Sequence, residues 1–194
     1  MTSVGCAMLG SMFLTRRDAL GLVLAGSAAW LFGARRARAS VAVGIGLPEL
    51  ISSSTTVGFA ASSEASSRWE EIGGSRRIVT YHRVGFDELV IGQDRELWVR
   101  TLGGRMGDIA QIVHGEAELR VGEPCLLFVC PARDGALVVT EMAQGHYPLR
   151  SQRLHPSPRL GRLVRPDGSA VRALVGRTRA EARGLLGEAR RAPK

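Results

Sequence analysis

The chain has 194 residues and a formal net charge of +8, which is unevenly distributed: residues 40–149 carry 14 acidic and 9 basic residues, whereas residues 150–194 carry 3 and 12. A basic tail can indicate nucleic-acid binding. Here, however, no aromatic residue that could stack on a base follows Tyr147, and arginine supplies every basic residue except Lys194, a bias typical of genome-wide base composition. These features favour a solvated basic surface over a nucleic-acid site, so we predict no nucleic-acid partner and keep binding by the basic tail as a third, weaker hypothesis.

Residues 1–39 have the three parts of a secretory leader. Arg16 and Arg17 supply the positive start, residues 19–33 carry no charge, and Ala37 and Ala39 form an A-x-A site that predicts cleavage after Ala39. As a helix, the uncharged run would cover roughly 22 Å, which is less than the roughly 30 Å hydrocarbon core of a bilayer. We therefore expect no permanent membrane span.

The stretch "TRRDALGLVL" around Arg16 and Arg17 resembles the twin-arginine export signal. This resemblance implies a twin-arginine-type signal peptide, the twin-arginine translocase as a partner during export, and a periplasmic or secreted location for the processed protein. An ordinary secretory leader that happens to contain two arginines stays open as the alternative.

Residues 40–54 form a lead-in segment, in which "LPELISSS" predicts a short helix that Pro48 opens. Residues 55–150 predict a β-barrel domain, because "TTVGFAAS", "RRIVTYHRVGFDELVIG" and "RELWVRTLGG" are rich in β-branched and aromatic residues. Gly85 lies inside the second run, where a glycine is typical of a bulge or bend. The "GGRMG" stretch predicts a wide β-loop with Arg105 exposed.

A hairpin follows in the same domain. Residues 125–130, "CLLFVC", are apolar on both faces and predict an inner strand; Asp134 and Gly135 supply the turn, and residues 136–142 return. Along a strand, Cys125 and Cys130 would lie roughly 16 Å apart on opposite faces, too far for a disulfide, which needs Cα atoms within about 7 Å. His146 begins the next predicted strand.

Residues 151–194 predict a basic loop and a C-terminal helix. Thr178 and Glu181 form a T-x-x-E capping box at the start of the helix. The apolar stripe of this helix, Ala180, Leu185 and Leu186, is thin, which predicts that the helix docks lightly or frays. With five to six strands before it, the chain is predicted to be mainly β, a small OB-like barrel or sandwich with a cleaved N-terminal leader.

At "ELWVRTLGG", "GEAELRVGEPCLLFV" and "MAQGHYP" the chain resembles a group of uncharacterised exported proteins of myxobacteria. The resemblance covers roughly residues 45–190 and implies export and a β domain, but no activity. A fainter likeness to the netrin-type, OB-like module of metalloprotease inhibitors rests on "GEPCLLF". Those inhibitors reach the metal with an N-terminal cysteine, and residues 40–51 contain none, so that mechanism does not carry over.

The sequence offers few signs of chemistry. The potential metal ligands include no close-spaced pair such as H-x-x-x-H or C-x-x-C; they are His82, His114, His146, His155, Cys125 and Cys130. No G-x-S-x-G motif occurs, and burial in an apolar strand would raise the pKa of Cys125 and blunt its reactivity. We therefore predict no catalytic residue, no metal and no cofactor.

The first functional hypothesis is a non-enzymatic binding module of the cell envelope or periplasm, with a protein or envelope component as its partner. OB-like folds bind through one barrel face and its loops. The residues predicted to take part are Trp98, Arg100, Arg105, His146 and Tyr147. The alternative is a periplasmic metalloprotein or enzyme that uses His82, His114 and His146.

Overall fold

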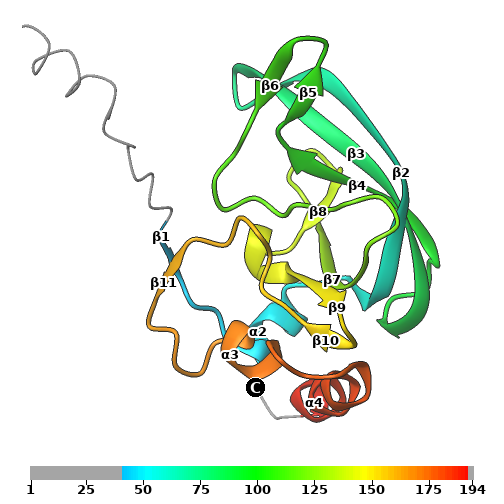
Figure 1. Ribbon diagram of the computed structural model, residues 1–194, viewed down its shortest axis with the longest axis vertical. Coiled ribbons are helices and arrows are strands. Elements are labelled where there is room, and N and C mark those ends of the chain that lie inside the picture. Colours follow the sequence, from blue (N-terminus) through cyan, green and yellow to red (C-terminus); the bar gives the residue numbers. More distant parts are fainter. Residues whose placement is uncertain (1–40, 192–194) are drawn as a thin grey trace, which may run out of the picture. The chain divides into compact units, whose positions relative to one another are not determined.

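The computed structural model describes residues 41–191, and the predicted export signal (Arg16, Arg17) and cleavage site (Ala37, Ala39) lie outside them. Figure 1 shows the arrangement of the elements. In chain order they are β1 (Val41–Val43), α2 (Leu47–Ser52), β2 (Thr56–Ile72), β3 (Ser75–Ile91), β4 (Glu96–Leu102), β5 (Gly104–Met106), β6 (Ile109–Gln111), β7 (Pro124–Pro131), β8 (Leu137–Val139), the 3-10 turn η1 (Met142–Gly145), β9 (His146–Arg150), β10 (Arg153–Leu154), β11 (Arg162–Val164), α3 (Ala170–Leu174) and α4 (Arg179–Arg191). The prediction of a mainly β chain with a C-terminal helix is confirmed.

The main sheet has seven strands in the order β10-β9-β7-β2-β3-β4-β8, and β8 also pairs with β7. Five strands, β7-β2-β3-β4-β8, therefore return on themselves as a partial ring. The closing pairs are short, because β8 meets β4 over two residue pairs, in parallel, and β7 over three. The main sheet alone exceeds the predicted five to six strands, and two further two-stranded sheets, β1-β11 and β5-β6, add to the number. The additional strands span only two or three residues each, too few for an alternating pattern to reveal them.

In the long ribbon of β2 and β3, Gly85 does not form the bulge that the sequence predicts there. Gly85 lies in regular register opposite Ala61, whereas the irregularities leave Ser63, Asp87 and Val90 without a partner in this pairing. The glycine that the ribbon needs is Gly58, where a Cβ atom would collide with the carbonyl oxygen of Glu88. The ribbon therefore bends at bulges, and Gly58 permits the close approach of the two strands beside them.

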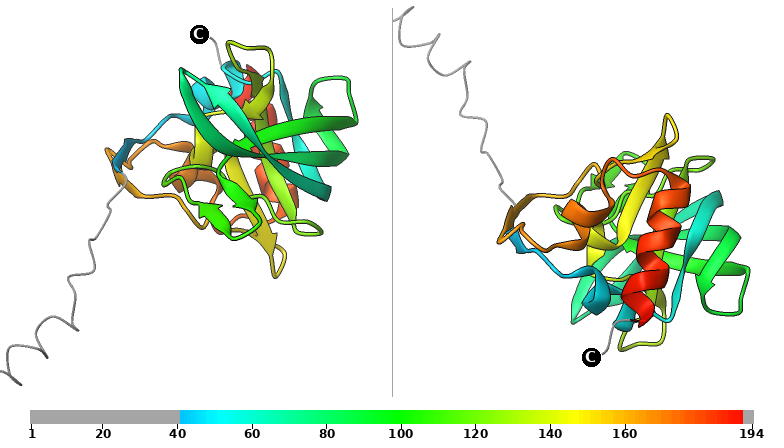
Figure 2. Two further views of the ribbon diagram at one scale, coloured as in Figure 1. Left: turned by 90° about the horizontal axis from the view of Figure 1, so that it is seen from above. Right: turned by 90° about the horizontal axis from the view of Figure 1, so that it is seen from below.

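The core has two parts, which share β7. Inside the partial ring, Cys125, Leu127 and Val129 pack with residues of β2, β3, β4 and β8. On the other face of β7, Leu126 and Phe128 pack with α2, α3 and α4. The predicted inner strand with two apolar faces is thus confirmed. Figure 2 shows α3 and α4 together on this second side of the strands.

The capping box at the start of α4 is confirmed, because the N–H and the hydroxyl of Thr178 donate to Glu181 Oε2 over 2.7 and 2.9 Å. The prediction of light docking was wrong. Ala182 and Leu186 are fully buried, whereas Ala180 is exposed. These two residues lie four apart and so share one helix face, which contacts α2. In residues 41–191, no helix has the length and apolar character needed to cross a membrane.

Candidate functional site

The side of the β2-β3-β4 ribbon that faces away from the ring interior carries aromatic and charged side chains; we call it the outer face. It is built from adjacent registers: Tyr81 pairs with Ser66 and Arg100, and Arg83 pairs with Glu64 and Trp98. Because side chains alternate along a strand, residues two apart point to the same face. The outer face comprises Glu64, Ser66, Arg68, Glu70, Tyr81, Arg83, Trp98 and Arg100.

A groove of about 400 Å³ lies on the outer face, and all three strands line it. Trp98 from β4 is 46% exposed, although it is a large hydrophobic residue. The other lining residues are Tyr81 from β3 and Glu64, Ser66 and Arg68 from β2. The groove therefore combines two aromatic rings with a carboxylate, a hydroxyl and a guanidinium, which is the mixture of apolar wall and few polar groups that ligand pockets use.

Glu70 fixes the side chains beside the groove. Its carboxylate accepts a 3.0 Å hydrogen bond from the Tyr81 hydroxyl and one of 2.8 Å from Arg68 Nε. The Arg68 guanidinium also lies 4.3 Å from the centre of the Tyr81 ring, within the range of a cation–π interaction. Burial favours a higher pKa for Glu70, but the hydrogen bonds from Arg68 and Tyr81 outweigh it and hold the pKa below its usual value. Tyr81 and Arg68 are thus held in place before any ligand arrives.

Arg100 lies beside the groove, two residues after Trp98 on β4 and opposite Tyr81. Its side chain is only 7% exposed, and Nη1 donates to Asp134 Oδ2 over 2.7 Å and to Glu70 Oε2 over 3.4 Å. The third arginine of the outer face, Arg83, donates from Nε to Glu96 over 2.9 Å. Each arginine of this face therefore has a carboxylate partner.

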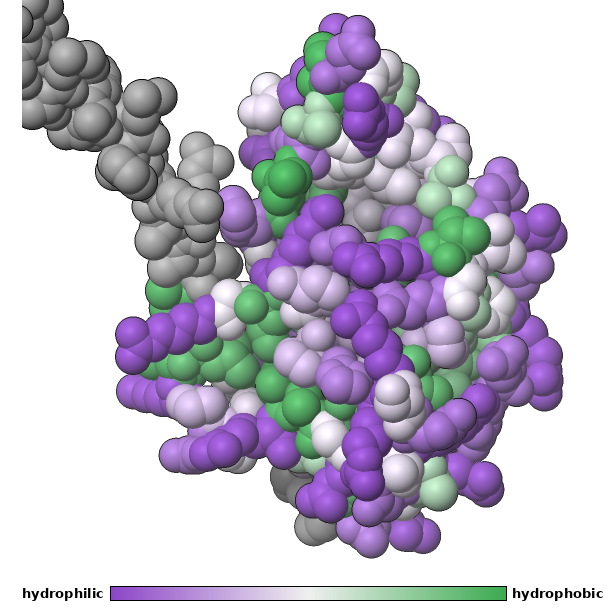
Figure 3. All heavy atoms as spheres, viewed as in Figure 1, coloured by the Kyte–Doolittle hydropathy of each residue, from purple (hydrophilic) through white to green (hydrophobic). Residues whose placement is uncertain are grey.

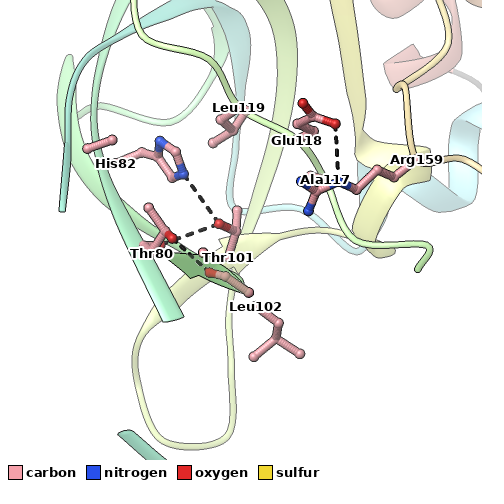
Figure 4. A pocket seen from close by; sticks show the side chains of 11 residues that line it. Thr80, His82, Thr101, Leu102, Ala117, Glu118, Leu119 and Arg159 are labelled. Atoms are coloured by element: carbon pink, nitrogen blue, oxygen red, sulfur yellow. Dashed lines mark hydrogen bonds and ion pairs between the residues drawn. The ribbon is translucent and has the colours of Figure 1, made fainter. Parts of the chain in front are cut away.

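On the opposite side of the ribbon lies a smaller pocket of about 240 Å³, shown in Figure 4. His82, Thr80 and Thr101 line it, and Nε2 of His82 lies 3.3 Å from the Thr101 hydroxyl. His82 is 5% exposed, and its Nδ1 is buried without a hydrogen-bond partner in the described residues. Burial lowers the pKa of His82 to about 4, so the ring is neutral at neutral pH.

The predicted "GGRMG" loop forms the β5-β6 hairpin and borders this inner pocket. Gly103 and Gly104 line it. A Cβ atom at Gly104, which has a φ of +144°, would collide with the Thr80 hydroxyl. Arg105 is exposed on the hairpin and donates to the Gly107 carbonyl over 3.0 Å. The start of the hairpin therefore lines the inner pocket and not the outer-face groove, and Arg105 lines neither of the two.

His146 and Tyr147 begin β9 and are buried, at 1% and 0% exposure. His146 Nδ1 lies 3.1 Å from the Ser157 hydroxyl, and burial lowers the pKa of His146 to about 4. The Tyr147 ring packs edge-on against Phe128, with 6.1 Å between ring centres. Of the five residues predicted to bind a partner, the structure brings only Trp98 and Arg100 together on one face.

The three histidines of the metalloprotein alternative occupy different environments: His82 and His146 are buried, and His114 is exposed. Within residues 41–191, no group of three or more His, Cys, Asp or Glu side chains is placed to hold a metal ion. Burial also raises the pKa of Cys125 to about 12, so its thiol stays protonated.

Sequence reasoning missed Glu64, Ser66, Arg68, Glu70 and Tyr81. The second half of β2 is rich in serine and shows no alternation of apolar and polar residues that would indicate a strand. A strand can be polar there because one side of it faces solvent. A scan against models of protein families and a search of curated proteins gave no match to this chain.

A second surface feature lies on the small β1-β11 sheet. Val41, Val43 and Val164 are 60%, 66% and 45% exposed. In the space-filling view of Figure 3, hydrophobic atoms gather where β1 and β11 lie. The exposed arginines Arg162 and Arg165 flank this apolar cluster, which is the second candidate docking surface of the described residues.

Proposed function

We propose that the protein is a non-enzymatic, exported binding module that holds a component of the cell envelope or periplasm in the groove of the outer face. In this proposal residues 1–39 direct export through the twin-arginine translocase and are removed after Ala39. Residues 40–194 then act in the periplasm or outside the cell. The leader pattern around Arg16 and Arg17 supports the export step.

The strand order supports an OB-like barrel. An OB fold is a partly open ring of five strands that binds ligands on the face of its second and third strands and with the loops after its first and fourth strands. With β2 as the first strand, β3 and β4 are the second and third, and β7 and β8 the fourth and fifth. Tyr81 and Trp98 then stand on the binding face, and Asp134 comes from the loop after the fourth strand.

The observation that carries the proposal is the exposure of Trp98 beside a Tyr81 and an Arg68 that Glu70 holds in place. Exposed tryptophan is a frequent anchor of binding sites. Side chains that are ordered before binding lose less conformational entropy on binding, which favours affinity. The charged groups beside the groove are engaged in ion pairs, an arrangement that suits recognition better than proton transfer.

The test is co-sedimentation with the insoluble envelope of the bacterium that makes the protein, using protein purified after expression with its own leader. We expect Trp98→Ala to weaken sedimentation at least about tenfold and Trp98→Phe to weaken it less, because phenylalanine keeps an aromatic face. Val164→Ala, which trims the competing apolar cluster, is expected to sediment like wild type. Binding that survives Trp98→Ala but not Val164→Ala would place the partner on the β1-β11 sheet instead.

A further inference from the structure

We infer that the occupant of the outer-face groove is an uncharged polysaccharide chain of the cell envelope. The inference rests on the proposed function and names the chemistry of its ligand. Three properties of the groove carry it: the aromatic rings, the neutralised arginines and the pattern of hydrogen-bonding groups.

The aromatic rings come first. Trp98 and Tyr81 stand on neighbouring strands and line one groove. The C–H faces of pyranose rings pack against aromatic side chains, and OB-type faces bind oligosaccharides as well as oligonucleotides. The groove volume of about 400 Å³ falls within the range of roughly 300–1,000 Å³ that small-molecule sites span. Stacking alone therefore leaves two classes of ligand, sugars and nucleobases.

Charge separates these two classes. A nucleic acid or an anionic polysaccharide gains affinity by displacing counterions with free lysine or arginine side chains. On the outer face the arginines are already neutralised: Arg68 by Glu70, Arg83 by Glu96 and Arg100 by Asp134. Glu64 adds a further carboxylate to the groove lining. A phosphodiester or carboxylate polymer would meet these acidic groups, so the face suits an uncharged chain.

The hydrogen-bonding groups agree with a polyhydroxyl ligand. The Glu64 carboxylate accepts hydrogen bonds from hydroxyl groups, and the Ser66 hydroxyl both donates and accepts. Arg68 uses Nε and one terminal nitrogen on Glu70, and the guanidinium carries further N–H donors for ring or glycosidic oxygens. Donors and acceptors thus flank the exposed Trp98 ring, beside a Tyr81 ring that Arg68 covers, and a sugar chain presents C–H faces and hydroxyl groups that match this arrangement.

The experiment separates the polysaccharide of the envelope from its proteins and then by charge. Envelope material is digested with proteinase K, extracted free of lipid, and passed over an anion-exchange column to give neutral and anionic pools. Each pool is cast into a native gel, and retardation of the protein is measured for wild type, Trp98→Ala, Trp98→Phe and Val164→Ala. Arg68→Gln serves as a variant that keeps the aromatic rings but loses the guanidinium.

We expect the neutral pool to retard wild type and Val164→Ala equally, with at least about tenfold weaker retardation of Trp98→Ala. Retardation should change little between low and moderate salt, because no counterions are released. Retardation only by the anionic pool, or envelope binding that proteinase K abolishes, would overturn the inference while the proposed function stands. Envelope binding that is insensitive to Trp98→Ala would overturn both this inference and the proposed function.

Discussion

Asp134, in the turn between β7 and β8, accepts a 2.7 Å hydrogen bond from Nη1 of Arg100 on β4. The bond spans the position where the partial ring closes, since β4 and β8 pair there over only two residues. The bond from Arg100 also holds the pKa of Asp134 below its usual value. A side-chain ion pair therefore reinforces the ring where backbone pairing is shortest.

Replacing Asp134 with asparagine should lower the urea midpoint of unfolding, because Arg100 would keep its charge in a buried position with only Glu70 as a charged partner. Asp108→Asn, on the exposed β5-β6 turn, is the matched control and should leave the midpoint unchanged. Equal midpoints for both variants would mean that the ion pair adds nothing to ring closure.

Acid should destabilise the fold through its buried histidines. The ordinary histidine pKa is 6.5, and burial lowers those of His82 and His146 to about 4. Below about pH 6.5 these histidines take up protons in the unfolded chain but stay neutral in the folded one. The free energy of unfolding therefore falls from about pH 6.5 down to about pH 4. By proton linkage each histidine costs up to about 3 kcal/mol at the lower end.

His82→Gln should flatten this dependence, measured as the urea midpoint at a series of pH values between neutrality and pH 5. His155→Gln, at an exposed histidine, is the control. The buried carboxyl of Glu116, whose pKa burial raises, acts in the opposite direction and is common to all variants. A wild-type slope in the His82→Gln protein would contradict the assignment.

The two strand glycines should respond oppositely to alanine. At Gly58 the new methyl group would meet the backbone carbonyl of Glu88, so Gly58→Ala is expected to cost about 1–3 kcal/mol of unfolding free energy. At Gly85 no heavy atom lies within 4 Å of the added carbon, so Gly85→Ala should be tolerated. Urea titration of both variants measures the two losses of unfolding free energy. A larger loss for Gly85→Ala than for Gly58→Ala would disprove the bulge geometry at Asp87 and Val90.

Cys125 and Cys130, the two cysteines among residues 41–191, should differ in reactivity. Cys125 is 3% exposed, with its pKa raised by burial to about 12, whereas Cys130 is half-buried; both thiols are free. Iodoacetamide should therefore alkylate Cys130 first in the folded protein and both residues in urea, as peptide mass spectrometry would show. Mobility in non-reducing gels should not change when both become alanine; a shift would reveal a disulfide.

Export should depend on the arginine pair. Arg16→Lys with Arg17→Lys keeps the charge of the leader but removes the feature that resembles the twin-arginine signal. We expect the precursor to accumulate in the cytoplasm, seen by cell fractionation and by the intact mass of the retained chain. Normal export of this variant would indicate an ordinary secretory leader.

Much of the fold could be predicted because its signals are local. The capping box at Thr178 and Glu181, the Asp134-Gly135 turn and the apolar run of β7 each follow from neighbouring residues, and the structure contains all three. The packing of α4 was misjudged because it depends on distant residues. Leu186 belongs to the predicted apolar stripe, but Ala182 does not, and the burial of both follows from contact with α2, more than 100 residues earlier.

Of the residues that line the groove, only Trp98 is among those predicted from the sequence to bind a partner. Trp98 and Arg100 stood out as an aromatic and a cation on one face of a strand. Arg68, Glu70 and Tyr81 did not, because their importance arises from cross-strand register, and single-sequence patterns do not reveal register. His146 and Tyr147 attracted interest by their residue types, but the burial that removes them from the surface comes from long-range packing.

Strand β7 joins the two parts of the core. Its odd-numbered side chains pack inside the partial ring, and its even-numbered ones pack against the helices. If either part of the core unfolded alone, one face of β7 would lose its packing partners. Heat or denaturant should consequently unfold both parts of the core in a single transition.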